Sequence, residues 1–252
     1  MRSGIAAAAL AALFAQGAVA DELQVLSAAS MQTVFREVIP DFERRSGHRV
    51  ALRYSTMGAI TDRVTRGEKA DLVISSPQSI QALVRNGRID ASSEVLVART
   101  GIGAVVPAGS ARPSIDSPLD FRRALRAARV VVYADPAGGG AAGVHIGRLI
   151  ERFGMAEEMR PKTKLAAGGD VTEVTLAQGE GALGLTQVSE IVGKPGAEYI
   201  PIGGALQNYT GFVAGTPAGE KQSKAAQALV RYLRTPEALA VMKSKGMQLK
   251  ED

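Results

Sequence analysis

Short side chains with hydroxyl groups interrupt a hydrophobic segment near the start of the chain. In residues 25–35, VLSAASMQTVF, the hydrophobic run stops at Ser27, Ala28, Ala29 and Ser30 and then continues with the spacing of a helix. Small side chains let a ligand approach the backbone, the two serines supply hydroxyl groups, and the free N–H groups of a helix N-terminus favour an anion. The other interpretation is that Ser30 is an ordinary helix N-cap. This segment alone leaves both interpretations open.

The same kind of sequence recurs at four more places, either where a predicted strand ends or just before a predicted helix. They are STMG (55–58, with Thr56, Met57 and Gly58), the serine pair 75–76, DPAGGGAAG (135–143) and GGDV (168–171). In open α/β sheets, ligands bind at the carboxyl ends of the strands. Five segments with hydroxyl groups, glycines and helix N-termini, and almost no carboxylates, predict a site where neutral donors hold a small anion.

The run of three glycines at 138–140 has two interpretations of its own. It lacks the Gly-Lys-Ser/Thr ending of a phosphate-binding P-loop and the G-x-G-x-x-G spacing of a dinucleotide-binding loop. We therefore favour a flexible turn before a helix over a phosphate cradle for a nucleotide.

The order of the predicted elements indicates an α/β fold. Short β-branched segments alternate with helical segments from residue 23 to residue 89, an order typical of a parallel, doubly wound sheet. A second α/β set follows from residue 95, and two helices divided near Pro236 complete the chain. We expect about two units of roughly a hundred residues each, closely joined with a cleft between them.

The composition excludes several kinds of protein. Among 252 residues there is no Cys and there are two His, which excludes a disulfide framework, a thiolate metal site and a cysteine nucleophile. We expect no metal and no other cofactor. The net charge of +5 arises from charges of both signs spread along the chain without a basic block, so nucleic acid is not expected as a partner.

The first twenty residues have the pattern of a secretory signal peptide. Arg2 forms a short basic region, IAAAALAALFA is hydrophobic, and AVA at 18–20 matches a small-x-small cleavage site. Cleavage after Ala20 would leave a periplasmic or secreted chain that begins near Asp21. Its net charge would fall from +5 to +4 because Arg2 is removed.

Five motifs follow one another along the mature chain: VLSAAS, ADLVISS, YADPAGGGAAG, GGDVTEV and GALGLTQVSE. In this order they resemble the periplasmic solute-binding proteins of the molybdate-binding type. The resemblance implies a type II periplasmic-binding-protein fold with two α/β lobes, each a doubly wound, mainly parallel sheet, and a ligand cleft between them. It implies that residues 21–103 and 208–252 form lobe 1 and that 104–207 form lobe 2. It also implies a small anion as ligand and an ABC transporter permease as partner, and we expect a monomer.

Three residues match positions that bind the ligand in that family. Ser30 falls on a serine that hydrogen-bonds the oxyanion, and Ala142 and Val171 fall on residues whose backbone N–H groups contact it. Two positions differ, because Met57 stands where the family has a second serine and Gln187 where it has a tyrosine. An oxyanion would lose two donors, and a hydrogen bond to a charged group is worth about 1.5–3 kcal/mol. We therefore expect a small organic carboxylate rather than molybdate or tungstate.

The expected ligand-binding set extends these positions to their neighbours. It consists of Ser27, Ala29, Ser30, Thr56, Met57, Gly58, Ala142, Gly143, His145, Val171 and Gln187. His145 and Arg148 are three residues apart and share one face of the helix after the glycine run. They would either face an anion or be a partly buried helix residue and a solvated surface residue.

The STMG and QVSE segments also resemble a divergent branch that includes a periplasmic aconitate isomerase. The alternative to a carrier is an enzyme that moves a proton along an allylic tricarboxylate in the same cleft. Such a reaction needs a base near the carbon acid with a pKa near the working pH. The candidates are His145, Glu190 and Tyr209, and we assign no catalytic residue. We expect a carrier in preference to an enzyme.

Overall fold

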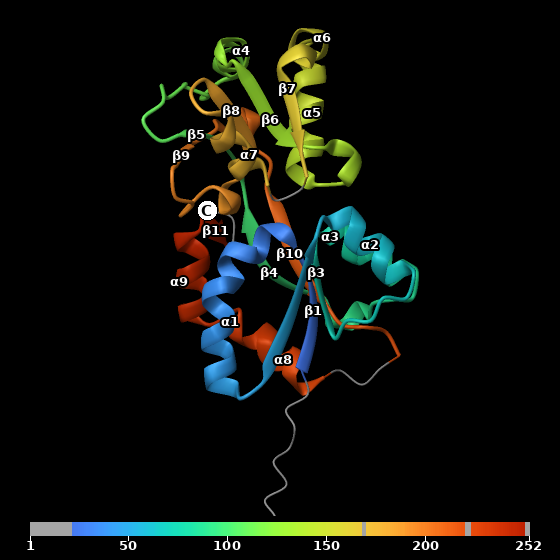
Figure 1. The fold of residues 1–252 in the computed structure, drawn as a ribbon. Helices are drawn as coiled ribbons and strands as arrows, with labels where there is room; N and C mark the ends of the chain where they lie inside the picture. Colours follow the sequence, from blue (N-terminus) through green and yellow to red (C-terminus); the bar gives the residue numbers. More distant parts are fainter. Residues whose placement is uncertain (1–21, 168–169, 220–222, 250–252) are drawn as a thin grey trace, which may run out of the picture.

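The computed structural model describes residues 22–167, 170–219 and 223–249, so the predicted signal peptide and cleavage site lie outside the described residues. The described chain forms two α/β lobes, each with its own sheet (Figure 1). We call the part with the six-stranded sheet lobe 1 and the part with the five-stranded sheet lobe 2. The expected two-lobed α/β fold is confirmed.

Lobe 1 is built on a sheet in the order β11-β4-β10-β3-β1-β2. Its strands are β1 (Glu22–Ala28), β2 (Arg49–Ser55), β3 (Leu72–Ser75), β4 (Val95–Thr100), β10 (Thr210–Gly215) and β11 (Met247–Gln248). Its helices are α1 (Gln32–Ser46), α2 (Met57–Thr65), α3 (Pro77–Arg85), α8 (Lys224–Tyr232) and α9 (Pro236–Ser244), with short 3-10 turns η1 (Ala29–Met31) and η2 (Ala91–Ser93). Helices α1, α8 and α9 cover one side of the sheet, and α2 and α3 cover the other (Figure 1).

Lobe 2 has the strand order β7-β6-β8-β5-β9. Its strands are β5 (Ile102–Pro107), β6 (Val130–Ala134), β7 (Thr163–Ala166), β8 (Ala182–Gln187) and β9 (Ala197–Ile200). Its helices are α4 (Pro118–Ala127), α5 (Ala141–Arg152), α6 (Ala156–Met159) and α7 (Val171–Gln178), with 3-10 turns η3 (Pro136–Gly138), η4 (Arg160–Lys162), η5 (Val188–Glu190) and η6 (Gly204–Leu206). The predicted helix over GGDVTEV is described from Asp170 onward, and its first two glycines lie outside the described residues.

Both sheets are mixed rather than mainly parallel. Strands β2, β1 and β3 pair in parallel in lobe 1, and so do β7, β6 and β8 in lobe 2. Strands β4, β10 and β11 in lobe 1, and β5 and β9 in lobe 2, make antiparallel pairs. The reason is that β4 carries the chain out of lobe 1 and β10 brings it back, so these two strands run in opposite directions. The parallel strands, whose carboxyl ends carry the small residues, are the part that the sequence pattern predicts.

Glycine, proline and capping side chains determine where several helices begin and end. Helix α1 ends where Gly47 adopts a left-handed conformation, with φ of 74°, and the Gly47 N–H donates to the carbonyl oxygen of Glu43. Helices α3, α4 and α9 each begin with a proline after a capping residue, namely Ser76, Ser117 and Thr235. Each cap accepts a hydrogen bond from a backbone N–H in the first helical turn, which fixes where the helix starts.

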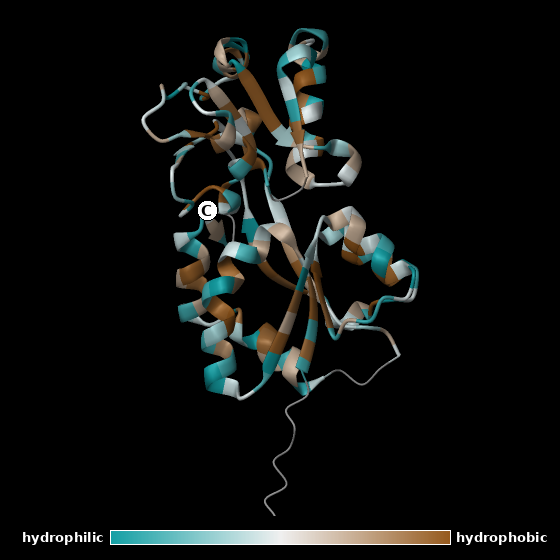
Figure 2. Cartoon of the chain, viewed as in Figure 1, coloured by the Kyte–Doolittle hydropathy of each residue, from teal (hydrophilic) through white to brown (hydrophobic). Residues whose placement is uncertain are grey.

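Each lobe has its own hydrophobic core. The core of lobe 1 includes the fully buried side chains of Phe35 and Phe212, and the main core of lobe 2 includes Phe121. Figure 2 shows hydrophobic strands within each lobe and helices that are hydrophilic on their outer sides. Three short elements, α6, β7 and β11, are absent from the sequence-based prediction. The segments TKLA of β7 and MQ of β11 contain no run of β-branched or aromatic residues that would indicate a strand.

The chain passes between the lobes at two adjacent places. Strand β4 ends at Thr100, Gly101 follows, and β5 of the second sheet starts at Ile102. The Gln207 side chain joins the outgoing and returning segments, since its Oε1 accepts from the Ile102 N–H at 2.6 Å and its Nε2 donates to the Ile102 carbonyl oxygen at 3.0 Å. The lobe boundaries at 103/104 and 207/208 remain a prediction. We propose Gly101 as the outgoing crossing, because β5 pairs with strands of the second sheet.

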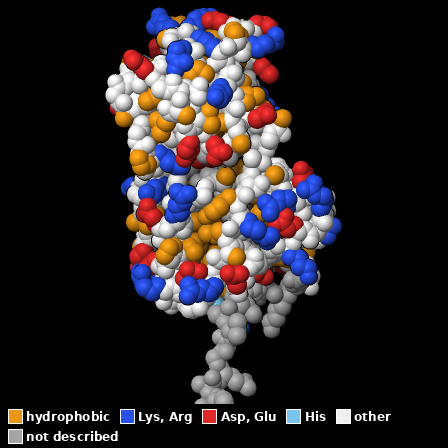
Figure 3. Space-filling model, viewed as in Figure 1, with side chains coloured by type: hydrophobic (Ala, Val, Ile, Leu, Met, Phe, Trp, Pro, Cys, Tyr) orange, Lys and Arg blue, Asp and Glu red, His pale blue; other side chains and the backbone are white. Residues whose placement is uncertain are grey.

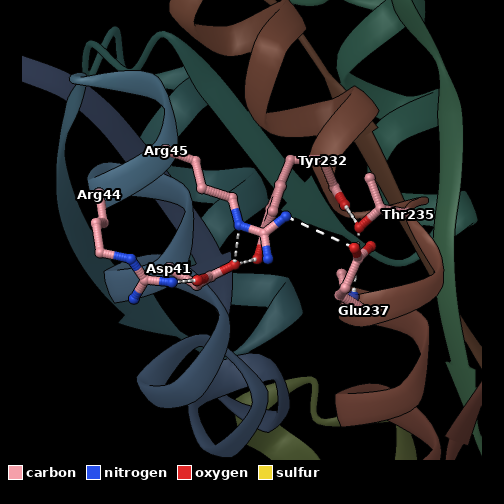
Figure 4. Close-up of polar contacts among 7 residues, drawn as sticks. Asp41, Arg44, Arg45, Tyr232, Thr235 and Glu237 are labelled. Atoms are coloured by element: carbon pink, nitrogen blue, oxygen red, sulfur yellow. Dashed lines mark hydrogen bonds and ion pairs between the residues drawn. The ribbon is translucent and has the colours of Figure 1, made fainter.

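A network of polar side chains fastens α1 to the C-terminal helices (Figure 4). The Asp41 carboxylate accepts a hydrogen bond from the Tyr232 hydroxyl, forms an ion pair with Arg44, and lies 2.7 Å from Nε of Arg45. The Arg45 guanidinium also reaches Glu237 at the start of α9, 3.6 Å away. These contacts join segments almost two hundred residues apart, and they explain how the end of the chain is held on lobe 1.

Candidate functional site

A small cavity of about 40 Å³ lies between the two lobes, at the carboxyl ends of the parallel strands. Lobe 1 contributes Ala28, Ala29, Ser30, Ser55, Thr56 and Met57 to its lining, and lobe 2 contributes Ala134, Gly140, Ala141, Ala142, Gly143, Thr186, Gln187 and Glu190. Seven predicted ligand-binding residues therefore line this cavity: Ala29, Ser30, Thr56, Met57, Ala142, Gly143 and Gln187. The cavity lies where strand ends from both lobes face each other.

Ser30 stands in the turn between β1 and α1 and is not a helix cap. The residue before α1 is Met31, no side chain caps either η1 or α1, and the Ser30 side chain is 6% exposed. The interpretation of Ser30 as an ordinary N-cap is therefore wrong. A buried hydroxyl that is not used by a helix is available to a ligand in the cavity.

Thr56, in contrast, has a structural task. It precedes α2, and its Oγ1 accepts a hydrogen bond from the Ala59 N–H at 3.3 Å. The next residue, Met57, is 6% exposed and presents a thioether side chain to the cavity. Lobe 1 thus lines the cavity with two serines that cap no helix, Ser30 and Ser55, beside an apolar wall at Met57.

Lobe 2 presents the N-terminus of α5 to the cavity. Gly140 precedes the helix, and the first helical hydrogen bond runs from the Val144 N–H to the Gly140 carbonyl oxygen. The N–H groups of Ala141, Ala142 and Gly143 therefore have no partner within the helix. A Cβ built on Gly143 would lie 2.2 Å from the Ala134 carbonyl oxygen. Glycine at this position lets α5 pack against the end of β6, and this packing brings the free N–H groups to the cavity.

The end of β8 and the turn η5 supply the polar side chains of lobe 2. Gln187 is 3% exposed, and its Oε1 has no hydrogen-bond partner among the described residues. Glu190 accepts a hydrogen bond from the Thr186 hydroxyl, and burial raises the pKa of the Glu190 carboxyl to about 7. The cavity is therefore lined by the Gln187 amide and by the Glu190 carboxyl group, whose protonated form can donate a hydrogen bond near neutral pH.

Five predicted residues lie outside the cavity. Ser27 is fully buried in β1 and its hydroxyl donates to the Ala28 carbonyl oxygen, and Val171 is fully buried at the start of α7. Gly58, His145 and Tyr209 line a neighbouring groove instead. The Nε2–H of His145 donates to the Leu206 carbonyl oxygen at 2.9 Å, and Tyr209 is 52% exposed with its ring beside the Arg99 guanidinium. Of the three candidate bases, only Glu190 lines the cavity.

The neighbouring groove has a volume of about 530 Å³ and shares Met57 and Ala141 with the cavity. The lobes touch along it, since a Cβ built on Gly139 would lie 3.1 Å from Cα of Gly58. The two glycines therefore allow a closer approach of the lobes than residues with side chains would.

Comparison with known proteins identifies the family. The family model for bacterial extracellular solute-binding proteins matches residues 23–248. The chain belongs to this family.

Relatives of this solute-binding protein include both a binding protein and an enzyme. The chain is 28% identical to an aconitate isomerase from Pseudomonas sp over 90% of its own length and 87% of the relative's. It is also 28% identical to the molybdate-binding protein ModA of Azotobacter vinelandii, over 95% of its own length and 94% of the relative's. The solved structure of the Azotobacter vinelandii periplasmic molybdate-binding protein matches with a TM-score of 0.72, covering 91% of this chain and all of that one, at 18% identity. The suspected resemblance is thus confirmed.

Several cavity residues of this solute-binding protein were not predicted from the sequence. Ser55, Ala134, Gly140 and Thr186 line the cavity in addition to the expected set. Thr186 precedes Gln187 at a strand end, which is the same signal that identified the other strand ends. Among the described residues, no group of three or more His, Asp or Glu is arranged to hold a metal, and no described helix is long and apolar enough to span a membrane. On the face drawn in Figure 3, charges of both signs are spread over both lobes.

Proposed function

We propose that this solute-binding protein binds a small organic carboxylate in the cavity between its lobes and delivers it to an ABC transporter. The observation that carries the proposal is that Met57 and Gln187 line the same cavity as Ser30 and the N-terminus of α5. Ser30 and the free N–H groups of α5 supply donors for a carboxylate. Met57 supplies an apolar surface for carbon.

A tetrahedral oxyanion fits this lining less well than a carboxylate. All of its outer atoms are hydrogen-bond acceptors, so an oxygen beside the Met57 thioether would lose a partner. The unpaired Oε1 of Gln187 would meet a further acceptor unless the amide turned round. A ligand with both carbon and oxygen can place its carbon at Met57 and its oxygens at Ser30 and α5.

A thermal-shift screen of the mature protein, residues 21–252, tests the proposal. The panel contains mono-, di- and tricarboxylates together with molybdate, tungstate, sulfate and phosphate. A ligand at a hundred times its Kd adds about 2.7 kcal/mol to the free energy of unfolding. We expect stabilisation by at least one carboxylate and none by molybdate. Stabilisation by molybdate without any by carboxylates would contradict the proposal.

A second candidate function is isomerisation of an unsaturated carboxylate, and the position of Glu190 favours it. Burial raises the pKa of this cavity-lining carboxyl to about 7, which makes it a stronger base than an ordinary glutamate when it is ionised. The N–H groups of α5 would stabilise charge that develops on the substrate carboxylate. The same residues would then bind the ligand and move one of its protons.

Proton NMR in deuterated buffer distinguishes the enzyme from the carrier. The mature protein is incubated with trans-aconitate, and the cis isomer or deuterium in the methylene group is the signal of catalysis. Glu190→Gln should abolish that signal, whereas Glu157→Gln, at an exposed position on α6, should leave it unchanged. Binding without isomerisation or exchange would exclude the second function for this substrate.

A further inference from the structure

We propose that the ligand carries a second anionic group, which Arg148 binds in the groove beside the cavity. This inference rests on the proposed function, because it assumes that the cavity itself holds one carboxylate. It narrows the ligand class from small carboxylates to molecules with two or three carboxylates on a short carbon chain.

The size of the cavity is the first argument. A cavity of about 10–15 Å³ holds one water molecule, and the cavity between the lobes has a volume of about 40 Å³. That is room for one carboxylate and the carbon next to it. A longer ligand has to extend into the groove of about 530 Å³, which meets the cavity at Met57 and Ala141.

The charge of the groove is the second argument. The described residues that line it include no Asp and no Glu, and Arg148 is the full positive charge among them. His145 lines the groove too, but its Nε2–H is used by the Leu206 carbonyl oxygen. The Thr210 hydroxyl group supplies a neutral donor nearby, whereas the Ser79 hydroxyl already donates to the Met57 carbonyl oxygen at 3.4 Å. The groove therefore attracts an anion without a carboxylate of the protein to compete with it.

The state of Arg148 is the third argument. It is exposed and makes no ion pair or hydrogen bond with the described part of the chain. Other arginines of lobe 2 are paired, such as Arg126 with Glu158 and Arg112 with Glu198. A guanidinium binds a carboxylate through two parallel hydrogen bonds, and this guanidinium is free to do so. Met57 then lies between the two anionic ends, where it contacts the carbon chain.

Calorimetric titration of the mature protein with acetate, succinate and tricarballylate tests the inference. We expect succinate or tricarballylate to bind at least tenfold more tightly than acetate, which is the effect of about one charge-assisted hydrogen bond. Arg148→Gln should remove this advantage and leave the affinity for acetate unchanged, and Arg148→Lys should restore part of it. Arg152→Gln is the matched control, because Arg152 lies one turn further along α5, where its guanidinium stacks on the Phe153 ring. It should change nothing.

Two outcomes separate this inference from the proposed function. Equal affinity for acetate and succinate, or unchanged succinate affinity in Arg148→Gln, would overturn the role of Arg148 and leave carboxylate binding in place. If no carboxylate binds and molybdate does, the proposed function fails and this inference fails with it. Thermal unfolding of Arg148→Gln should match the unmodified protein, since an exposed side chain without partners adds little to stability.

Discussion

Two carboxyl groups of this chain have pKa values that move in opposite directions, and their surroundings explain the difference. Asp41, on α1, accepts a hydrogen bond from the Tyr232 hydroxyl and faces Arg44 and Arg45, so the pKa of Asp41 is lowered. Burial raises the pKa of Glu190, in the cavity, to about 7, although the hydrogen bond from the Thr186 hydroxyl lowers it. Two further carboxylates, Glu173 and Asp170, raise it and Lys194 lowers it.

The difference separates polar groups that hold the fold from polar groups that await a ligand. The network around Asp41 satisfies its charges within the protein, and it joins α1 to α8 and α9 (Figure 4). In the cavity, by contrast, Oε1 of Gln187 has no hydrogen-bond partner among the described residues, and the pKa of the Glu190 carboxyl group is raised to about 7. Buried polar groups without partners reduce stability, and a binding site is where such a cost has a function. Substitutions in the two regions should therefore affect different properties.

The largest effect is expected from restoring the two missing donors. Met57→Ser together with Gln187→Tyr should bind molybdate about a hundredfold more tightly than the unmodified protein, because two hydrogen bonds of about 1.5 kcal/mol or more each become available. Calorimetric titration measures the change. Met57→Ala with Gln187→Ala is the control, since it alters the same side chains without adding a hydroxyl. An equal gain in the control would show that space, rather than donors, limits oxyanion binding.

Removal of the Ser30 hydroxyl should act on affinity alone. We expect Ser30→Ala to weaken binding of the carboxylate found in the screen about tenfold, since a charge-assisted hydrogen bond is lost. The unfolding temperature should stay unchanged, because Ser30 caps no helix. Thr56→Ala should lower the free energy of unfolding by about 0.5–2 kcal/mol, since Thr56 caps α2. A loss of stability without a loss of affinity in Ser30→Ala would contradict the assignment.

The pH dependence of affinity should reveal Glu190. A neutral Glu190 can donate a hydrogen bond to a bound carboxylate, whereas an ionised one repels it, so affinity should fall about tenfold between pH 6 and pH 8 as the group titrates near 7. Glu190→Gln should flatten this profile. The raised pKa also means that the contribution of this group to stability is complete below 4.5 and is lost as the pH rises through about 7. A profile that stays steep in Glu190→Gln would assign the titration to another group.

The smallest effect is expected at the network on α1, and it should concern stability only. Tyr232→Phe removes the hydrogen bond to Asp41 and should lower the unfolding temperature slightly without changing ligand affinity. Because the pKa of Asp41 is lowered in the folded protein, its contribution is present above 3.8 and is lost as the pH falls below that value. Burial raises the pKa of Tyr232 to about 12, so the tyrosine contribution is lost only as the pH rises through that value. Urea titrations of both proteins at pH 3 and pH 7 measure the difference, which should be smaller at pH 3.

The sequence predicted those parts of the fold and the site that depend on neighbouring residues. Alternating strands and helices, helix caps and small residues at strand ends identified the two lobes and much of the cavity lining, including Ser30 and Ala142. Such patterns arise because the local chain must form a strand, a turn and a helix in order. The same strand-end signal could have identified Thr186.

Contacts between distant residues could not be predicted in this way. His145 was expected at the ligand, but its Nε2–H donates a hydrogen bond to a carbonyl oxygen 61 residues away, that of Leu206. Ser27 was expected there too, but its side chain is buried within the sheet. Successive side chains of a strand point to opposite faces, so the residues near a strand end do not all face the cavity. The Asp41–Tyr232 pair joins residues 191 positions apart. Burial around Glu190, which decides its pKa, likewise depends on how the two lobes and α7 pack.

A cavity with donors from both lobes, an apolar wall at Met57 and an amide at Gln187 should select a carboxylate over an inorganic oxyanion such as molybdate. Calorimetric titration of the mature protein with molybdate, with sulfate as a control, tests this claim most directly. We predict no binding of molybdate tighter than about 0.1 mM, since two donors at about 1.5–3 kcal/mol each are missing. Submicromolar binding of molybdate would contradict the claim and would make this protein an oxyanion carrier.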